Sequence, residues 1–364
     1  MSADPETAAE PLDGWHRRHG ASWRDDGGLR LVAGYGDPAS ELALLGRSCG
    51  LAERRWIEAF DVTGEDRGRF LNGYVTCDVA ALEPGAGAPG FFTDVKGGIL
   101  ADAVITACAA GLRVAVPAGR ARALIAHLGR YVLADRVELA AREDLRQLLV
   151  AGPGAGELVA QLAPEEPGPW SLRAATVAGR PVEIQRQRDL GAPVYVLWAS
   201  AADAAVVADE LTTRGAEPVG FDALESLRIL AGVARYGVDF DDSRFPQETG
   251  LDDAVSYTKG CYLGQEVVAR IHYRGHVNHA LRGLRGAGAT LPPSGAALEY
   301  EGQEVGRLGS VTRSPATGEA VGLAILHRKA AAIGTEVAVA GSSPGREAPL
   351  RVEEPGFALA AAGG

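Results

Sequence analysis

The chain has 364 residues, of which 46% are hydrophobic and 23% charged, so it can form two or three compact domains, each with its own core. Its net charge of −11 excludes broad, non-specific binding to nucleic acid or anionic membrane, because both are polyanions. No stretch approaches the roughly 18 continuous apolar residues of a membrane span, and the acidic first twelve residues lack the pattern of an export signal. We therefore expect a cytoplasmic protein without membrane association.

In chain order, the first 40 residues predict an irregular arm with one short strand. From residue 41 onward, strands and hairpins alternate with short helices. The patterns predict helices at 41–46, 65–71, 120–131 and just before Gly215, and strands at 29–32, 57–62, 91–95, 99–106, 112–116, 148–150, 182–184 and 195–197.

The second half begins with a clear helix at 221–231, on which Arg228 follows an apolar face. After Arg285, glycines and five short β-prone runs predict a small antiparallel barrel. The runs lie at 297–300, 305–311, 320–326, 336–339 and 350–352.

The expected fold class is α+β, with mixed antiparallel sheets and helices followed by a small C-terminal β-barrel. The expected domains are an arm (1–40), an α+β unit of two similar halves (41–285, with a boundary near 164–170), the barrel (286–353) and a loose tail (354–364).

Metal and disulfide chemistry are not predicted. The four cysteines occur singly, without a C-x-x-C pair, a spacing typical of reduced thiols. Three histidines lie between residues 272 and 279, but no acid or cysteine joins them within that run, so we expect no metal site.

The densest group of reactive residues lies at 257–266, with the sequence YTKGCYLGQE. Gly260 and Gly264 predict a tight turn that holds Cys261 at the start of a helix. There the helix N-terminus and the ammonium of Lys259 would favour the thiolate, and Gln265 with Glu266 would fix the turn. The alternative is that Cys261 is a small apolar filler.

Two further groups have both a functional and a structural interpretation. The hairpin 94–102 places a lysine and two carboxylates around a glycine turn, and it could simply be a solvated hairpin. The stretch 267–285 has four arginines, three histidines and no acid. This basic stripe is either a solvated rim or a dock for an anion.

The segment Lys-Gly-Cys-Tyr-x-Gly-Gln-Glu resembles the signature of the YgfZ-type folate-binding proteins, relatives of the glycine-cleavage T-protein, an aminomethyltransferase. Flanking segments between 221 and 285 fit the same family in order. The resemblance implies a T-protein-like unit that binds tetrahydrofolate or a one-carbon derivative in a central cleft. The candidate site residues are Cys261 and Lys259 as catalytic groups, and Asp102, Arg228, Tyr236, Tyr262, Gln265 and Glu266 as folate ligands.

By this resemblance the chain would be an accessory protein for iron-sulfur cluster assembly or repair. It would support iron-sulfur enzymes, including tRNA-modifying ones, with assembly or client proteins as partners. Ala101 stands where the related transferases have the first of two aspartates. Because a missing carboxylate removes the charge partner of an amine intermediate, we do not expect a stand-alone aminomethyltransferase. Two alternatives stay open: a folate-dependent aminomethyltransferase of the glycine cleavage type, and a folate-sensing scaffold without chemistry.

Overall fold

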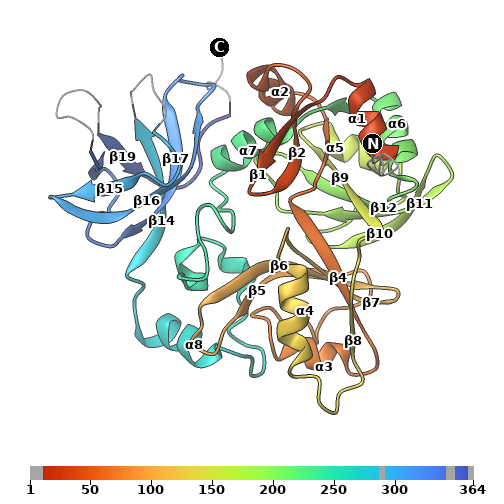
Figure 1. Cartoon of the computed structure of the whole chain (residues 1–364), viewed down its shortest axis with the longest axis horizontal. Coiled ribbons are helices and arrows are strands. Elements are labelled where there is room, and N and C mark those ends of the chain that lie inside the picture. The colour runs from red at the N-terminus through yellow and green to blue at the C-terminus, as the bar shows by residue number, and fades with distance from the viewer. Residues whose placement is uncertain (1–10, 287–291, 342–348, 360–364) are drawn as a thin grey trace, which may run out of the picture. The chain divides into compact units, whose positions relative to one another are not determined.

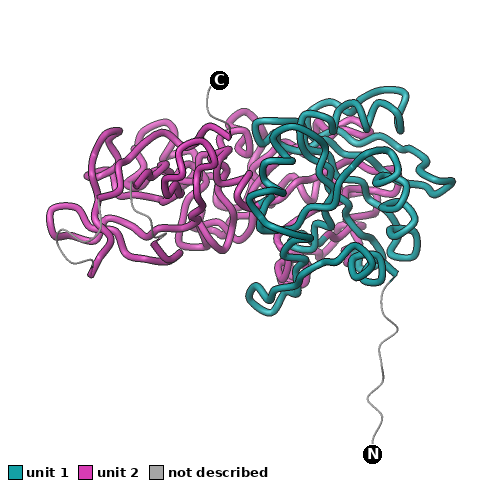
Figure 2. The backbone as a smooth tube through the Cα atoms, turned by 90° about the horizontal axis from the view of Figure 1, so that it is seen from above, with its two compact units in different colours: residues 1–58, 142–224 teal, residues 59–141, 225–364 magenta. Residues whose placement is uncertain are grey.

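The computed structural model describes residues 11–286, 292–341 and 349–359. Parts of the predicted segments lie outside the described residues: 1–10 of the arm, 287–291 and 342–348 of the barrel, and 360–364 of the tail. The chain divides into two compact units, each built from two distant stretches of sequence (Figure 2). Unit 1 comprises Met1–Glu58 and Arg142–Leu224, and unit 2 comprises Ala59–Ala141 and Glu225–Gly364. Within the described ranges, no helix is both long and apolar enough to cross a membrane.

Unit 1 is organised around a six-stranded sheet in the order β10-β11-β12-β9-β3-β13. The strands are β3 (Gly50–Glu53), β9 (Leu145–Ala151), β10 (Leu172–Val177), β11 (Arg180–Arg186), β12 (Val194–Ser200) and β13 (Glu217–Pro218). Because side chains alternate along a strand, Val150, Ile184 and Leu197 all point to one face. There they form a core with α1 (Pro11–Arg18), α5 (Ala155–Ala160) and α6 (Ala204–Thr213).

For the described residues after 10, the predicted short strand at 29–32 lies within β2, but the rest of the predicted arm is not irregular. These residues form α1 and a hairpin of β1 (Ser22–Asp26) and β2 (Leu29–Gly34), followed by α2 (Pro38–Leu45). Trp15 is buried in the unit 1 core, and the adjacent His16 is buried against Glu53, with 2.7 Å between Nε2 and Oε2. The sequence pattern counts His16 as exposed because it is polar, although a distant partner buries it. The apolar periodicity of this helix is therefore too weak to predict it.

Unit 2 contains a five-stranded sheet in the order β5-β6-β7-β4-β8. The strands are β4 (Ile57–Thr63), β5 (Gly87–Thr93), β6 (Ile99–Cys108), β7 (Gly111–Pro117) and β8 (Glu138–Ala141). The helices α3 (Arg67–Asn72) and α4 (Ala121–Gly129) cover one face (Figure 1). Phe60, Phe92 and Ile105 fill the core between the sheet and these helices.

A closed six-stranded barrel completes unit 2, in the order β14-β17-β16-β15-β18-β19. Its strands are β14 (His279–Gly286), β15 (Ala297–Tyr300), β16 (Gln303–Arg313), β17 (Ala320–His327), β18 (Glu336–Val339) and β19 (Leu350–Glu353). The predicted α+β class with a C-terminal antiparallel barrel is confirmed. The sequence missed β14, because its arginines made it look like part of a basic stripe, although Leu281 and Leu284 are buried.

The segment between sheet and barrel places the candidate site. It contains α7 (Phe221–Leu230), two short 3₁₀ turns, η1 (Pro246–Glu248) and η2 (Asp252–Ala254), and α8 (Gln265–Arg274). One apolar cluster ties these elements of unit 2 together, with Phe91 from the sheet, Phe240 from the loop, Val268 from α8 and Leu281 from the barrel. The loop is therefore an ordered part of the core.

Candidate functional site

The segment 257–266 packs against the β5–β6 hairpin of the same unit. Thr93 Oγ1 donates to the carbonyl of Leu263 at 2.6 Å. Gly264, the residue before α8, has φ 85°, and a Cβ there would lie 2.4 Å from the carbonyl oxygen of Asp94. Glycine is thus required both by the backbone conformation and by the close approach. Gly260, expected to be similar, has open space around it and a φ outside the left-handed region.

Replacing Gly264 with alanine is expected to lower the free energy of unfolding by about 2–4 kcal/mol, the sum of a left-handed backbone and a steric clash. Gly119→Ala is the matched control, because Gly119 has φ 84° and nothing within 4 Å of an added Cβ. It should cost only the backbone term, about 1–2 kcal/mol. Urea unfolding followed by circular dichroism measures both, and equal losses would contradict the tight packing of the turn.

Lys259 anchors this turn to the loop after α3. Its Nζ donates to the carbonyls of Asn72 at 2.7 Å, Val75 at 2.8 Å and Cys77 at 2.7 Å. Burial lowers the pKa of Lys259 to about 8, so the group is still largely an ammonium at pH 7. All three of its protons point to carbonyls. These contacts give Lys259 a structural role in place of the expected pairing with the exposed thiol of Cys261. A chemical role for Cys261 stays a prediction.

The neighbouring residues differ in exposure. Tyr262 is buried, its ring 5.3 Å from Lys259 Nζ, and burial raises the pKa of its hydroxyl. Gln265 Nε2 donates to the carbonyl of Gly260 at 3.4 Å and so spans the turn. The Glu266 side chain is 93% exposed and lies 3.9 Å from Arg270. Glu266 therefore faces solvent instead of fixing the turn.

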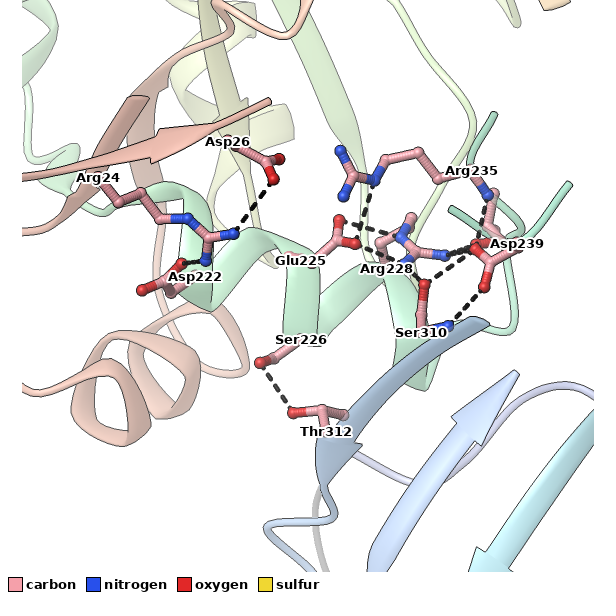
Figure 3. Close-up of polar contacts among 11 residues, drawn as sticks. Arg24, Asp26, Asp222, Glu225, Ser226, Arg228, Arg235, Asp239, Ser310 and Thr312 are labelled. Atoms are coloured by element: carbon pink, nitrogen blue, oxygen red, sulfur yellow. Dashed lines mark hydrogen bonds and ion pairs between the residues drawn. The ribbon is translucent and has the colours of Figure 1, made fainter. Parts of the chain in front are cut away.

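Arg228, predicted as a folate ligand at the edge of an apolar face, is buried in a polar network of unit 2 (Figure 3). Its guanidinium donates to Asp239 at 2.7 Å, to Glu225 at 2.6 Å and to the carbonyl of Val233 at 2.5 Å, and also to Ser310 Oγ on β16. These contacts hold α7 against the barrel. These contacts give Arg228 a structural role, and its contact with a folate stays a prediction.

The two positions after the hairpin turn point to opposite faces of β6. Ala101 is fully buried in the core with Phe92, whereas Asp102 is half-buried and pairs across the strands with Phe91, on the other face. A carboxylate at position 101 would have to point into an apolar core. Of these two positions, Asp102 is the one that lies outside this core.

Arg120 links the side chain of Tyr236 to strand β6. Its Nη2 donates to the carbonyl of Leu100 at 2.6 Å and to the hydroxyl of Tyr236, and its Cζ lies 4.8 Å from the centre of the tyrosine ring. Burial raises the pKa of Tyr236, so the hydroxyl keeps its proton and can still donate it. No local pattern pointed to Arg120, because its side chain contacts Leu100 and Tyr236, which are distant in the chain.

The basic stripe is not one surface. Arg270 and Arg274 are exposed on α8, whereas Arg285 on β14 pairs with Glu353 and Glu319, each at 3.0 Å. Arg282 donates to the carbonyl of Ala331. In the part of the chain that the structure describes, no three His, Cys, Asp or Glu side chains are grouped to hold a metal ion.

Two protein-family models match this chain, one before the barrel and one over it. Residues 12–259 match the GCVT N-terminal domain, and residues 280–357 match the glycine cleavage T-protein C-terminal barrel domain. An aminomethyltransferase of Bordetella parapertussis is 31% identical, over 86% of this chain and 87% of that protein. One from Parafrankia sp. is 28% identical over 98% of this chain and 99% of that protein.

A solved structure agrees in fold. The glycine cleavage system aminomethyltransferase T of Bartonella henselae superposes with a TM-score of 0.86 at 23% identity, covering 96% of this chain and 98% of that one.

These findings overturn two expectations. The iron-sulfur accessory role is wrong as the main interpretation, because the relatives that match over most of the chain bear the name aminomethyltransferase. The expectation that the chain is not such an enzyme is wrong for the same reason. With one domain model covering most of its length and a second covering its barrel, the chain belongs to the glycine cleavage T-protein family.

Proposed function

We propose that this chain is an enzyme that transfers an aminomethyl group to tetrahydrofolate. One observation carries the proposal: the half-buried carboxylate of Asp102 on β6, in a chain that matches proteins named aminomethyltransferase over most of its length. Their shared name supports the reaction, and the position of Asp102 supports a residue that could assist it.

The side chains around β6 suit a folate. Asp102 supplies an acceptor and a negative charge, and Tyr236 supplies a flat ring with a free O–H donor. Arg120, which bridges Tyr236 and the β6 backbone, fixes the tyrosine ring relative to the strand. Tetrahydrofolate combines a planar ring system with nitrogen atoms that carry the one-carbon unit, so its chemistry fits this set of groups.

In the proposed reaction, a nitrogen of the bound folate attacks the aminomethyl carbon, and the bond from that carbon to the carrier breaks, with its electron pair and a proton going to the carrier. The amino group then leaves as ammonia when a second folate nitrogen bonds to the same carbon. Asp102 stabilises the positive charge that develops on nitrogen as the amino group leaves, because an oriented carboxylate in a partly buried site interacts more strongly than one in water. Tyr236 orients the ligand through its hydroxyl. Ala101 takes no part, since it lies in the core.

Replacing Asp102 with asparagine is expected to slow aminomethyl transfer by about 10²-fold, because the shape is kept and the charge is lost. The assay is tetrahydrofolate-dependent ammonia release from an aminomethylated carrier, with calorimetry of tetrahydrofolate binding beside it. The binding constant should change much less than the rate. Equal rates for the variant and the wild type would remove Asp102 from the reaction.

The narrower assignment to the YgfZ type rests on residues 257–266 and their flanks, and it stays a prediction. The non-catalytic scaffold is the competing outcome of the same assay: tetrahydrofolate would bind, and no ammonia would be released.

A further inference from the structure

A buried carboxylate joins the loop 245–256 of unit 2 to the first strand of the barrel. Glu248 lies in η1, and its side chain is only 5% exposed. One carboxylate oxygen accepts from the backbone N–H of Phe245 at 3.2 Å, and the other lies 3.1 Å from Nδ1 of His279, the first residue of β14. Because an ionised carboxylate only accepts hydrogen bonds, Nδ1 of His279 is the donor. We call the contact between Glu248 and His279 the loop clamp.

The titratable groups that face the loop clamp come from η1 and from the end of β17. η1 contributes Glu248 and no other titratable side chain. β17 ends at His327, which is paired with His279 across the two strands, with 5.4 Å between the ring centres. The next two residues, Arg328 and Lys329, are exposed cations. On these two elements, Glu248 is therefore the carboxylate that can balance a positive charge on His279.

The surroundings decide which of the two facing histidines carries a proton. Partial burial, and then the positive charges of His279, Lys329 and Arg328, lower the pKa of His327. Its Nδ1 accepts from the backbone N–H of Lys329 at 3.3 Å, so that nitrogen is unprotonated. In the linker before β14, Nε2 of His276 likewise accepts from Arg328, at 2.7 Å. These contacts favour neutral rings for His276 and His327, whereas the carboxylate favours the charged form of His279.

The charge on His279 matters because Glu248 is buried. A buried carboxylate without a positive partner is strongly destabilised, and a neutral imidazole supplies a hydrogen bond but no charge. Histidine is the side chain whose charge ordinarily changes between about pH 5 and 8. The loop clamp is therefore strong while His279 is an imidazolium, and it weakens as the pH rises and His279 loses its proton.

The other attachments of this loop do not titrate in that range. Thr76 Oγ1 donates to the carbonyl of Ala254 at 2.5 Å, and the backbone N–H of Ser256 donates to the carbonyl of Thr76 at 2.9 Å. Leu251 and Leu281 pack in one apolar cluster. The loop is thus held to the sheet by neutral hydrogen bonds, and its polar contact with the barrel is the titratable one.

We propose that Glu248 and His279 form a pH-sensitive clamp, closed in mild acid and open at alkaline pH, which controls the mobility of the loop 245–256 relative to the barrel. The inference is independent of the proposed function, because neither residue takes part in the proposed reaction.

Hydrogen exchange of the full chain, followed by mass spectrometry and corrected for the intrinsic effect of pH, tests the clamp. In the wild type, peptides from 245–256 are expected to exchange about tenfold faster at about pH 8.5 than at about pH 6, because a hydrogen bond to a charged group is weakened. His279→Gln keeps a donor without a charge, so these peptides should exchange fast at both pH values. His279→Lys keeps a charge, so they should exchange slowly at both.

His127→Gln is the matched control, because His127 lies on α4 and contacts Arg130 on the same helix. Its exchange in 245–256 should equal that of the wild type at both pH values. Peptides from β6 serve as the internal reference. The inference is wrong if wild-type exchange in 245–256 does not change with pH, if β6 changes equally, or if His279→Lys and His279→Gln behave alike. The proposed function is tested by ammonia release, so its failure is seen separately.

Discussion

Replacing Asp239 with alanine is expected to lower the free energy of unfolding by about 3–5 kcal/mol. It removes one of the two carboxylates that pair with the buried Arg228 guanidinium, and it leaves the backbone N–H groups of Arg235 and Ser310 without their acceptor. The Asp239 side chain is fully buried. One oxygen accepts from Arg228 at 2.7 Å and from the backbone N–H of Arg235 at 2.8 Å, and the other accepts from the N–H of Ser310 at 2.8 Å (Figure 3). The carboxylate thus joins α7, the following loop and barrel strand β16.

The measurement is urea unfolding with two probes. All five tryptophans, at positions 15, 23, 56, 170 and 198, lie in unit 1, so their fluorescence reports that unit, while circular dichroism reports the whole chain. Glu304→Ala on the same strand is the control, since its side chain is 52% exposed and its ion pair among the described residues is with exposed Arg307. It should cost less than about 1 kcal/mol. A loss for Asp239→Ala no larger than this control would contradict the network.

Lys259→Met is expected to cost about 3–5 kcal/mol, because it leaves the carbonyls of Asn72, Val75 and Cys77 without their donor. Methionine preserves the length and apolar character of the stem, so the loss reports the ammonium and not the packing. The same unfolding experiment measures it, with circular dichroism as the main probe.

The control for this substitution is Lys96→Met. Lys96 also precedes a glycine, but its side chain is exposed. Methionine there should change stability by less than about 0.5 kcal/mol. If Lys259→Met were as mild, and instead changed the reactivity of the Cys261 thiol, the anchoring role would be wrong and the pairing expected from the sequence would be restored.

The sequence predicted the elements with strong periodicity. Helix α7, the β5–β6 hairpin and five barrel strands appear where their patterns lie, because each buries one regular face. Helix α1 and strand β14 were missed. Each combines buried apolar residues with polar ones whose partners are distant, as His16 with Glu53 and Arg285 with Glu353. A local pattern does not reveal such partners.

The candidate site was harder to predict, because the role of each residue depends on the direction in which its side chain points. The sequence singled out Lys259 and Arg228, but it could not show that the Lys259 ammonium donates to backbone carbonyls or that the Arg228 guanidinium pairs with Asp239. The face to which residue 101 points could be assigned only from the register of the strand pair. A bulge at Leu100 separates Ile99 from Ala101, so the face of each residue after the turn cannot be counted from the turn itself.

The most direct test of the proposed function is a reconstituted glycine cleavage assay with the wild-type chain as the only aminomethyltransferase. We expect ammonia and a one-carbon folate to form in equal amounts, only when tetrahydrofolate is present, and about 10²-fold more slowly with Asp102→Asn. Tight binding of tetrahydrofolate by calorimetry without any turnover of the wild type would contradict the account and leave a folate-binding scaffold.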